Sequence, residues 1–124
     1  MSDKERQDIR KRVYQYALRA IRLHQHLQEQ GDSAGWIIGK QYLRAATSIG
    51  ANIEEAQASE SRADFVHKLG IAQKEARECL FWLRLLTDSR IVSNSRLKPL
   101  ANETDELIAV ITAIVVSTKS RQAA

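Results

Sequence analysis

Four long stretches of this sequence carry apolar residues at alternating spacings of three and four, and only three short breaks separate them. That spacing places apolar side chains along one side of an α-helix. An all-β domain needs turn residues about every 8–12 positions, but the 124 residues include only 5 Gly and 1 Pro. We therefore predict an all-α chain with helices over about residues 3–30, 33–59, 62–89 and 95–119.

The first, third and fourth predicted helices each carry an apolar stripe that can face a core. The first stripe is Ile9, Val13, Tyr16, Ala20, Leu23 and Leu27. The third helix has Phe65, Leu69, Ala72, Ala76, Cys79 or Leu80, Leu83 and Leu86 at the 3.5-residue repeat of a bundle seam. The fourth has Leu97, Leu100, Thr104, Leu107, Ile111, Ile114 and Thr118, with Pro99 expected in its first turn. Short connections make consecutive helices antiparallel, so residues 1–124 are predicted to form one up-down-up-down four-helix bundle.

The second and fourth helices carry more apolar surface than one bundle seam requires. The second has two rows: Ile38, Tyr42, Ala45, Ile49 and Ala56, and Trp36, Leu43, Ala46, Gly50 and Ile53. Ile108, Val110, Val115 and Val116 lie off the seam of the fourth. We infer a second buried surface and hence a homo-oligomer; the alternative is a monomer with wide core faces. Gly39 and Gly50 indicate close helix packing.

The positive charge is concentrated in the first helix. The chain has a net charge of +4 and a pI near 9.5. Residues 1–22 hold seven basic and three acidic residues, whereas residues 23–124 hold twelve of each. A polar stripe opposite the core contains Lys11 or Arg12, then Gln15, Arg19, Arg22 and His26. Such a face favours an anionic partner, most simply nucleic acid; the alternative is an ordinary solvated helix face.

No pattern of catalytic residues stands out. The sequence lacks a glycine-rich phosphate loop, G-x-S-x-G and H-E-x-x-H. A di-iron bundle needs two Glu-x-x-His motifs, and the nearest match is one Asp64-x-x-His67. Cys79 reads as a small buried hydrophobe. We therefore expect no enzymatic activity, no metal and no cofactor. The charged N-terminus and the short apolar run Leu107–Val116 favour a cytoplasmic protein with no membrane span.

A polar group interrupts the apolar part of the second helix. Thr47, Ser48 and Asn52 either bond back to the preceding helical turn or form a recognition site. Arg44 is embedded among apolar neighbours, so its stem should pack while its head reaches a groove or an interface. An ion pair with Glu54, Glu55 or Glu75 and a phosphate contact are both open for this arginine.

The segments LRAATSIGANIEEAQA (43–58) and FVHKLGIAQKEARECLFWLRLL (65–86) resemble a known family. The first fits R-A-x-x-S-I-x-x-N-I-x-E through Arg44, Ala45, Ser48, Ile49, Asn52, Ile53 and Glu55. The second fits F-x-x-x-L-x-I-A through Phe65, Leu69, Ile71 and Ala72, with Glu75 further along. These motifs resemble the bacterial four-helix-bundle family of ribosomal RNA intervening-sequence proteins. Many relatives have Gly after the glutamate, where this chain has Ala56–Gln57. The FWLRLL ending is also similar to the accessory proteins of diversity-generating retroelements, which bind RNA and a reverse transcriptase.

The resemblance implies a ring-shaped homopentamer without enzymatic activity and suggests a role with nucleic acid. The leading hypothesis is therefore an oligomeric bundle that binds RNA or a ribonucleoprotein through Arg12, Arg19, Arg22, Lys40 and Arg44. The alternative is a protein–protein scaffold or an accessory subunit, for example of a reverse transcriptase, that binds through exposed apolar residues such as Trp82. A metalloenzyme bundle is the third hypothesis. No small-molecule substrate is evident.

Overall fold

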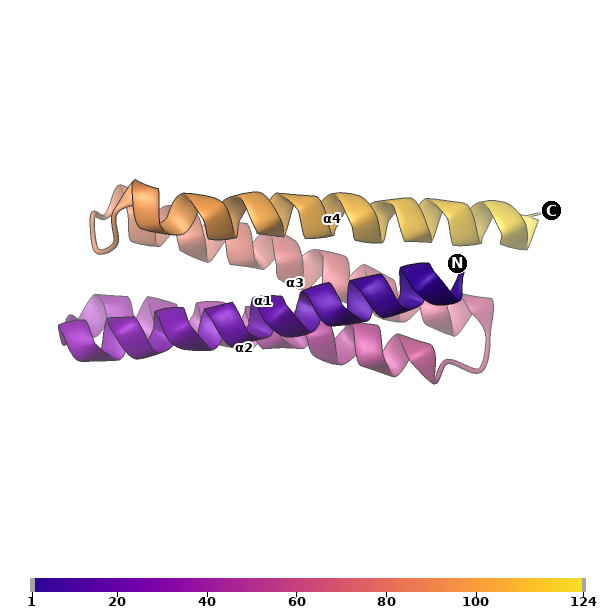
Figure 1. The fold of residues 1–124 in the computed structure, drawn as a ribbon, viewed down its shortest axis with the longest axis horizontal. Helices are drawn as coiled ribbons and strands as arrows, with labels where there is room; N and C mark the ends of the chain where they lie inside the picture. Colours follow the sequence, from indigo (N-terminus) through magenta and orange to yellow (C-terminus); the bar gives the residue numbers. More distant parts are fainter. Residues whose placement is uncertain (1, 124) are drawn as a thin grey trace.

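The computed structural model describes residues 2–123, and their backbone forms four helices and no strand (Figure 1). The helices are α1 (Asp3–Gln30), α2 (Ser33–Gln57), α3 (Arg62–Asp88) and α4 (Asn94–Ala123). These bounds lie close to the predicted stretches, except that α4 continues beyond residue 119. The all-α fold with four helices is thus confirmed.

Side chains and one glycine define the helix ends. Ser2 and Glu5 form a reciprocal capping box at the start of α1. Gly31 ends α1 at φ +71°, a left-handed conformation that glycine adopts without steric cost. Asp32 and Ser61 cap α2 and α3 by accepting hydrogen bonds from the backbone amides of Gly35 and Asp64. Such tight breaks force each helix to turn back along the previous one.

The helices run antiparallel in chain order, and both chain ends lie at the right-hand end of Figure 1. The connections from α1 to α2 and from α3 to α4 lie at the opposite end. The α2–α3 pair has the most extensive contact, and the α1–α4 pair has the least. The first and last helices therefore face each other across the least closed side of the bundle.

The predicted seams form the core. All six stripe residues of α1, and all seven of α4, are buried. In α3 the seam runs through Leu69, Ala72, Ala76, Cys79, Leu83 and Leu86, all buried. A hydrogen bond of 2.6 Å joins the Tyr16 and Thr104 hydroxyls inside this core, and the Thr104 hydroxyl also donates to the Leu100 carbonyl. Both buried polar groups are therefore satisfied.

The expected position of Pro99 is wrong by one turn. Because α4 begins at Asn94, Pro99 lies in its second turn, where its missing N–H leaves the Ser95 carbonyl without a helical partner. Ser95 and Pro99 are both exposed, so solvent can reach that carbonyl. No helix between residues 2 and 123 is long and apolar enough to cross a membrane.

Single-chain packing covers much of the apolar surplus of α2 and α4. Ala46, Ile53 and Val115 are buried, while Ile108 and Val110 are partly covered. The apolar residues that stay exposed include Trp36, Ile37, Phe81, Leu85 and Val116. A wide core face thus explains part of the surplus, and the homo-oligomer stays a prediction.

Candidate nucleic-acid interface

Three arginines meet on the side of the bundle between α1 and α4. Arg19 and Arg22 from α1 and Arg96 from α4 line a pocket of about 200 Å³, and Leu23, Leu97 and Leu100 complete its wall. Within residues 2–121, none of these arginines forms an ion pair with a carboxylate. Their charges are therefore available to an anion. We call Arg19, Arg22 and Arg96 the arginine triad.

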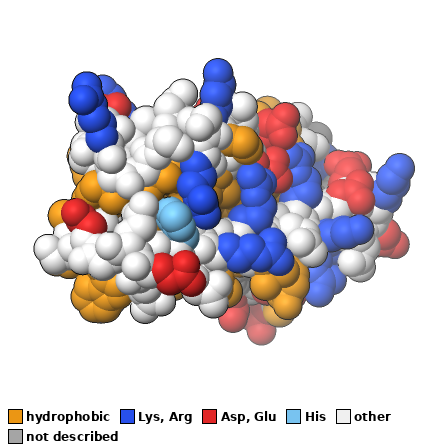
Figure 2. All heavy atoms as spheres, turned by 60° about the vertical axis from the view of Figure 1, so that its left-hand side comes forward, with side chains coloured by type: hydrophobic (Ala, Val, Ile, Leu, Met, Phe, Trp, Pro, Cys, Tyr) orange, Lys and Arg blue, Asp and Glu red, His pale blue; other side chains and the backbone are white. Residues whose placement is uncertain are grey.

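Figure 2, which turns the left-hand end of Figure 1 toward the viewer, shows Lys and Arg side chains gathered across the middle of the surface. The triad lies toward this end, because Arg22 belongs to the last third of α1 and Arg96 to the first turn of α4. A concentration of unpaired cations on one face raises the local potential and attracts polyanions.

Arg12, predicted to bind nucleic acid, forms ion pairs that join α1 to α4. Its guanidinium donates to Glu103 at 2.5 Å and to Glu106 at 2.9 Å. The hydrogen bond with Glu103 is the main cause of a raised Arg12 pKa. Two carboxylates thus neutralise the charge of Arg12. Along the basic stripe of α1, the arginines without a carboxylate partner in residues 2–121 begin at Arg19.

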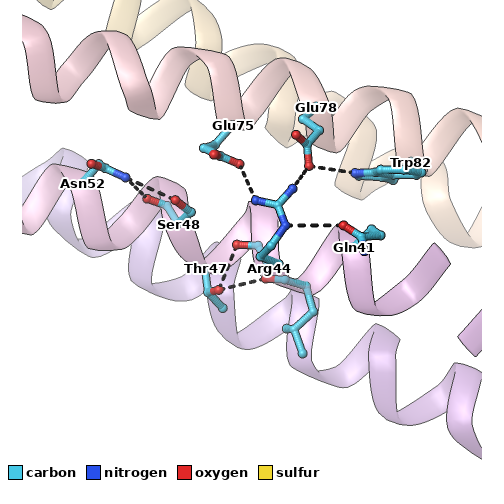
Figure 3. Close-up of polar contacts among 9 residues, drawn as sticks. Gln41, Arg44, Thr47, Ser48, Asn52, Glu75, Glu78 and Trp82 are labelled. Atoms are coloured by element: carbon cyan, nitrogen blue, oxygen red, sulfur yellow. Dashed lines mark hydrogen bonds and ion pairs between the residues drawn. The ribbon is translucent and has the colours of Figure 1, made fainter. Parts of the chain in front are cut away.

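Arg44 lies on the opposite side, between α2 and α3 (Figure 3). It pairs with Glu75 at 3.3 Å and with Glu78, whose carboxylate also accepts a hydrogen bond from the Trp82 indole at 3.0 Å. Gln41 accepts a further contact from the Arg44 side chain. The ion pair with Glu75 is the structural alternative left open by the sequence. These residues tie α2 to α3 across their exposed edge.

The polar group of α2 bonds within its own helix. The Thr47 hydroxyl donates to the Leu43 carbonyl at 2.9 Å, and the Asn52 amide donates to the Ser48 carbonyl at 2.9 Å (Figure 3). The sequence left two alternatives for this group, and these bonds to the preceding helical turn are the structural one. Glu55 is exposed and forms no ion pair among residues 2–121.

Lys40 lies away from the triad on the exposed side of α2. Its ammonium group is 4.7 Å from the centre of the Trp36 ring, a cation–π contact. The five predicted basic contacts therefore do not form one surface. Arg19 and Arg22 come together, Arg12 and Arg44 are ion-paired, and Lys40 covers an aromatic ring.

Arg96 was not among the binding residues predicted from the sequence. It lies in the charge-balanced part of the chain, so a local count of charges gives no signal there. Only the return of α4 alongside α1 brings it to Arg19 and Arg22. The predicted bundle places the fourth helix beside the first, but it does not specify that Arg96 faces Arg19 and Arg22.

The described residues show no arrangement typical of metal or thiol chemistry. Between residues 2 and 123, no three His, Cys, Asp or Glu side chains come together where they could hold a metal ion. Burial raises the pKa of the Cys79 thiol to about 12. A thiol that stays protonated at neutral pH is a poor nucleophile, so Cys79 fits the predicted role in packing.

The fold and this surface define a class of protein: a small antiparallel four-helix bundle with unpaired arginines on the side between its first and last helices. The chain belongs to the family of 23S rRNA-intervening sequence proteins, whose pattern it matches over residues 5–113.

A solved relative agrees with that assignment. The chain is similar to the crystal structure of a protein with unknown function from the S23 ribosomal protein family of Bacteroides thetaiotaomicron. The two share 35% sequence identity with a TM-score of 0.84, over 90% of this chain and 97% of the relative. No curated protein matches the chain. The family and the fold are therefore established by similarity.

Proposed function

We propose that the protein is a non-enzymatic, homo-oligomeric bundle that binds RNA, alone or within a ribonucleoprotein, through the arginine triad. The observation that carries this proposal is the convergence of Arg19, Arg22 and Arg96 on one pocket without a carboxylate partner in residues 2–121. Guanidinium groups bind phosphate oxygens in a two-pronged geometry. Membership in a family named for 23S rRNA intervening sequences supports RNA as the polyanion.

Oligomerisation would increase the affinity of the arginine triad for RNA. A single triad offers three cations, and three phosphate contacts give weak binding at physiological salt. Several copies of the triad in one oligomer would bind one strand together and multiply the affinity. The triad is lined by leucines rather than aromatic rings, so we expect little base stacking and little sequence preference.

An exposed apolar patch supports the oligomer. Trp36 and Ile37 lie near the start of α2, and Phe81 and Leu85 lie near the end of α3, with 37–58% of each side chain's residue area exposed. Because α2 and α3 are antiparallel neighbours, these four residues lie at the same end of the pair. A second copy of the chain is the occupant we propose for this patch.

The test is RNA binding by fluorescence anisotropy across a series of salt concentrations. We expect Arg22→Gln and Arg96→Gln each to weaken binding and to reduce the slope of log affinity against log salt by about 1. Arg84→Gln is the matched control, because Arg84 is exposed at the same end but pairs with Asp88 on α3. Equal affinities for all variants, or affinity that is independent of salt, would refute the RNA proposal.

The second candidate is a protein scaffold, and the same apolar patch favours it. Trp82, the residue suggested by the sequence, is half-buried with its indole bonded to Glu78, so Phe81 is the better contact. Light scattering after size exclusion separates the roles. Phe81→Ser should reduce the mass of a homo-oligomer; an unchanged mass, combined with loss of a protein partner, would favour the scaffold.

A further inference from the structure

A second group of arginines lies at the other end of the bundle, where the chain ends meet. Arg6 of α1, Arg62 at the start of α3 and Arg121 near the end of α4 line a pocket of about 380 Å³. Ser59 and Ser61 from the α2–α3 connection also line it. Glu60 is the single acidic residue of the lining and is exposed, so the pocket carries an excess of positive charge.

Hydrogen bonds position Arg62 and Arg121 without pairing either with a carboxylate. Arg62 donates to the Arg121 backbone carbonyl at 3.0 Å, and Arg121 donates to the Thr118 hydroxyl at 3.5 Å. Within residues 2–121, none of the three forms an ion pair with a carboxylate. By contrast, Arg10, Arg12, Arg44 and Arg84 all do. Three converging guanidinium groups repel one another, and an anion between them would remove that repulsion.

Buried polar atoms without partners gather at the same pocket. Among residues 2–121, five buried side-chain polar atoms have no hydrogen-bond partner, and three of these belong to lining residues: Arg6 Nε, Gln57 Oε1 and Ser59 Oγ. Buried polar groups are usually hydrogen-bonded, so these three atoms can serve as donors and acceptors for a polar molecule in the pocket. The Gln57 amide is already oriented, because its nitrogen donates to the Ile53 carbonyl at 2.9 Å. Its oxygen therefore needs a donor.

We propose that this pocket binds a terminal phosphate group, either free phosphate or a phosphate monoester. Arg6, Arg62 and Arg121 would donate to its anionic oxygens, and the Ser59 hydroxyl would add one more donor. Gln57 would accept a hydrogen bond from a hydroxyl of the phosphate or of the attached sugar. The chemistry is shared by a small phosphate ester and by the 5′-phosphate of an RNA strand. The pocket lies at the opposite end from the arginine triad, so it is independent of the RNA interface proposed above.

The experiment is calorimetric titration of the full chain with inorganic phosphate, with adenosine 5′-monophosphate, and with a short RNA carrying either a 5′-phosphate or a 5′-hydroxyl, at constant ionic strength. We expect saturable binding of one phosphate group per chain. Arg62→Gln should weaken it at least about tenfold, because a bidentate contact is lost. Arg62 is exposed, so this variant should fold, and circular dichroism checks that it does. Arg84→Gln is the control, because Arg84 pairs with Asp88 and lines neither this pocket nor the triad, so this variant should bind every probe like the wild type.

The outcomes separate the two sources of phosphate. Tighter binding of the 5′-phosphate RNA than of the 5′-hydroxyl RNA, with the difference lost in Arg62→Gln, identifies a strand end as the ligand. Binding of phosphate and the monophosphate without a 5′-end effect identifies a small molecule. If phosphate and the monophosphate do not bind saturably and the two RNAs bind equally, or if Arg84→Gln loses binding as much as Arg62→Gln, the proposal is overturned.

Discussion

Two glycines in neighbouring helices offer a direct test of the packing. Gly39 lies on α2 against α1, and an added Cβ would come within 2.6 Å of Leu27 Cδ1 and 3.4 Å of His24 Nδ1. Gly70 lies on α3, and a Cβ there would have no neighbour within 4 Å. Alanine therefore makes the same chemical change in a crowded position and in an open one.

Alanine should change the free energy of unfolding in opposite directions at the two positions. Alanine is favoured over glycine in a helix by about 1 kcal/mol, so Gly70→Ala should raise the free energy of unfolding by about that amount. Gly39→Ala has the same gain, but Leu27 is fully buried and can move only by disturbing the core. Such overpacking costs about 1–3 kcal/mol, so we expect a net loss of about 1 kcal/mol and a difference between the variants of about 2 kcal/mol.

Urea unfolding followed by circular dichroism measures both values. At this chain length 1 kcal/mol corresponds to about 4 °C in Tm, so thermal melts give an independent check. If Gly39→Ala is as stabilising as Gly70→Ala, the α1–α2 contact is looser than described and the packing argument is wrong.

Three further predictions concern buried and paired groups. Tyr16→Phe should lower the free energy of unfolding by about 1–2 kcal/mol in urea titrations, because Thr104 loses its buried partner while keeping its bond to Leu100; no change would exclude that hydrogen bond. Burial raises the pKa of the Cys79 thiol from 9.0 to about 12, so the unfolded chain loses this proton first and stability should fall as the pH rises from about 9 to about 12. Cys79→Ala should show a shallower fall in unfolding experiments across that range, and an identical slope would contradict the shift. Arg44→Ala should destabilise the protein by less than about 1 kcal/mol in thermal melts, because the arginine side chain is half exposed; a larger loss would show a stronger α2–α3 tie.

The sequence predicted the core well because helix periodicity is a local property. The stripe from Ile9 to Leu27 and the one from Leu97 to Thr118 are buried as predicted, since burial follows from which face of a helix is apolar. The prediction that Pro99 lies in the first turn of its helix was wrong, because it depended on which residue begins α4. Helix ends are set by individual caps, which a periodic pattern does not specify.

The arrangement of charges at the candidate interface could not be derived from the sequence, because it depends on residues far apart in the chain. Arg12 is neutralised by Glu103, 91 positions away, and Arg44 by Glu75 and Glu78 on the next helix. Arg96 joins the triad by the same kind of long-range meeting. Charge counts along one helix identify a basic stripe, but they do not show which of its members a neighbouring helix will pair.

The unequal contacts among the helices have a consequence for how the chain folds. The three well-packed pairs, α1–α2, α2–α3 and α3–α4, are all neighbours in the sequence, whereas the sparse α1–α4 contact joins the two ends. Nearly all the native contacts can therefore form by closing short loops, with little entropy lost. A topology of this kind gives a low contact order and refolding on the microsecond-to-millisecond scale. We expect the α2–α3 hairpin to form first and the outer helices to join it independently.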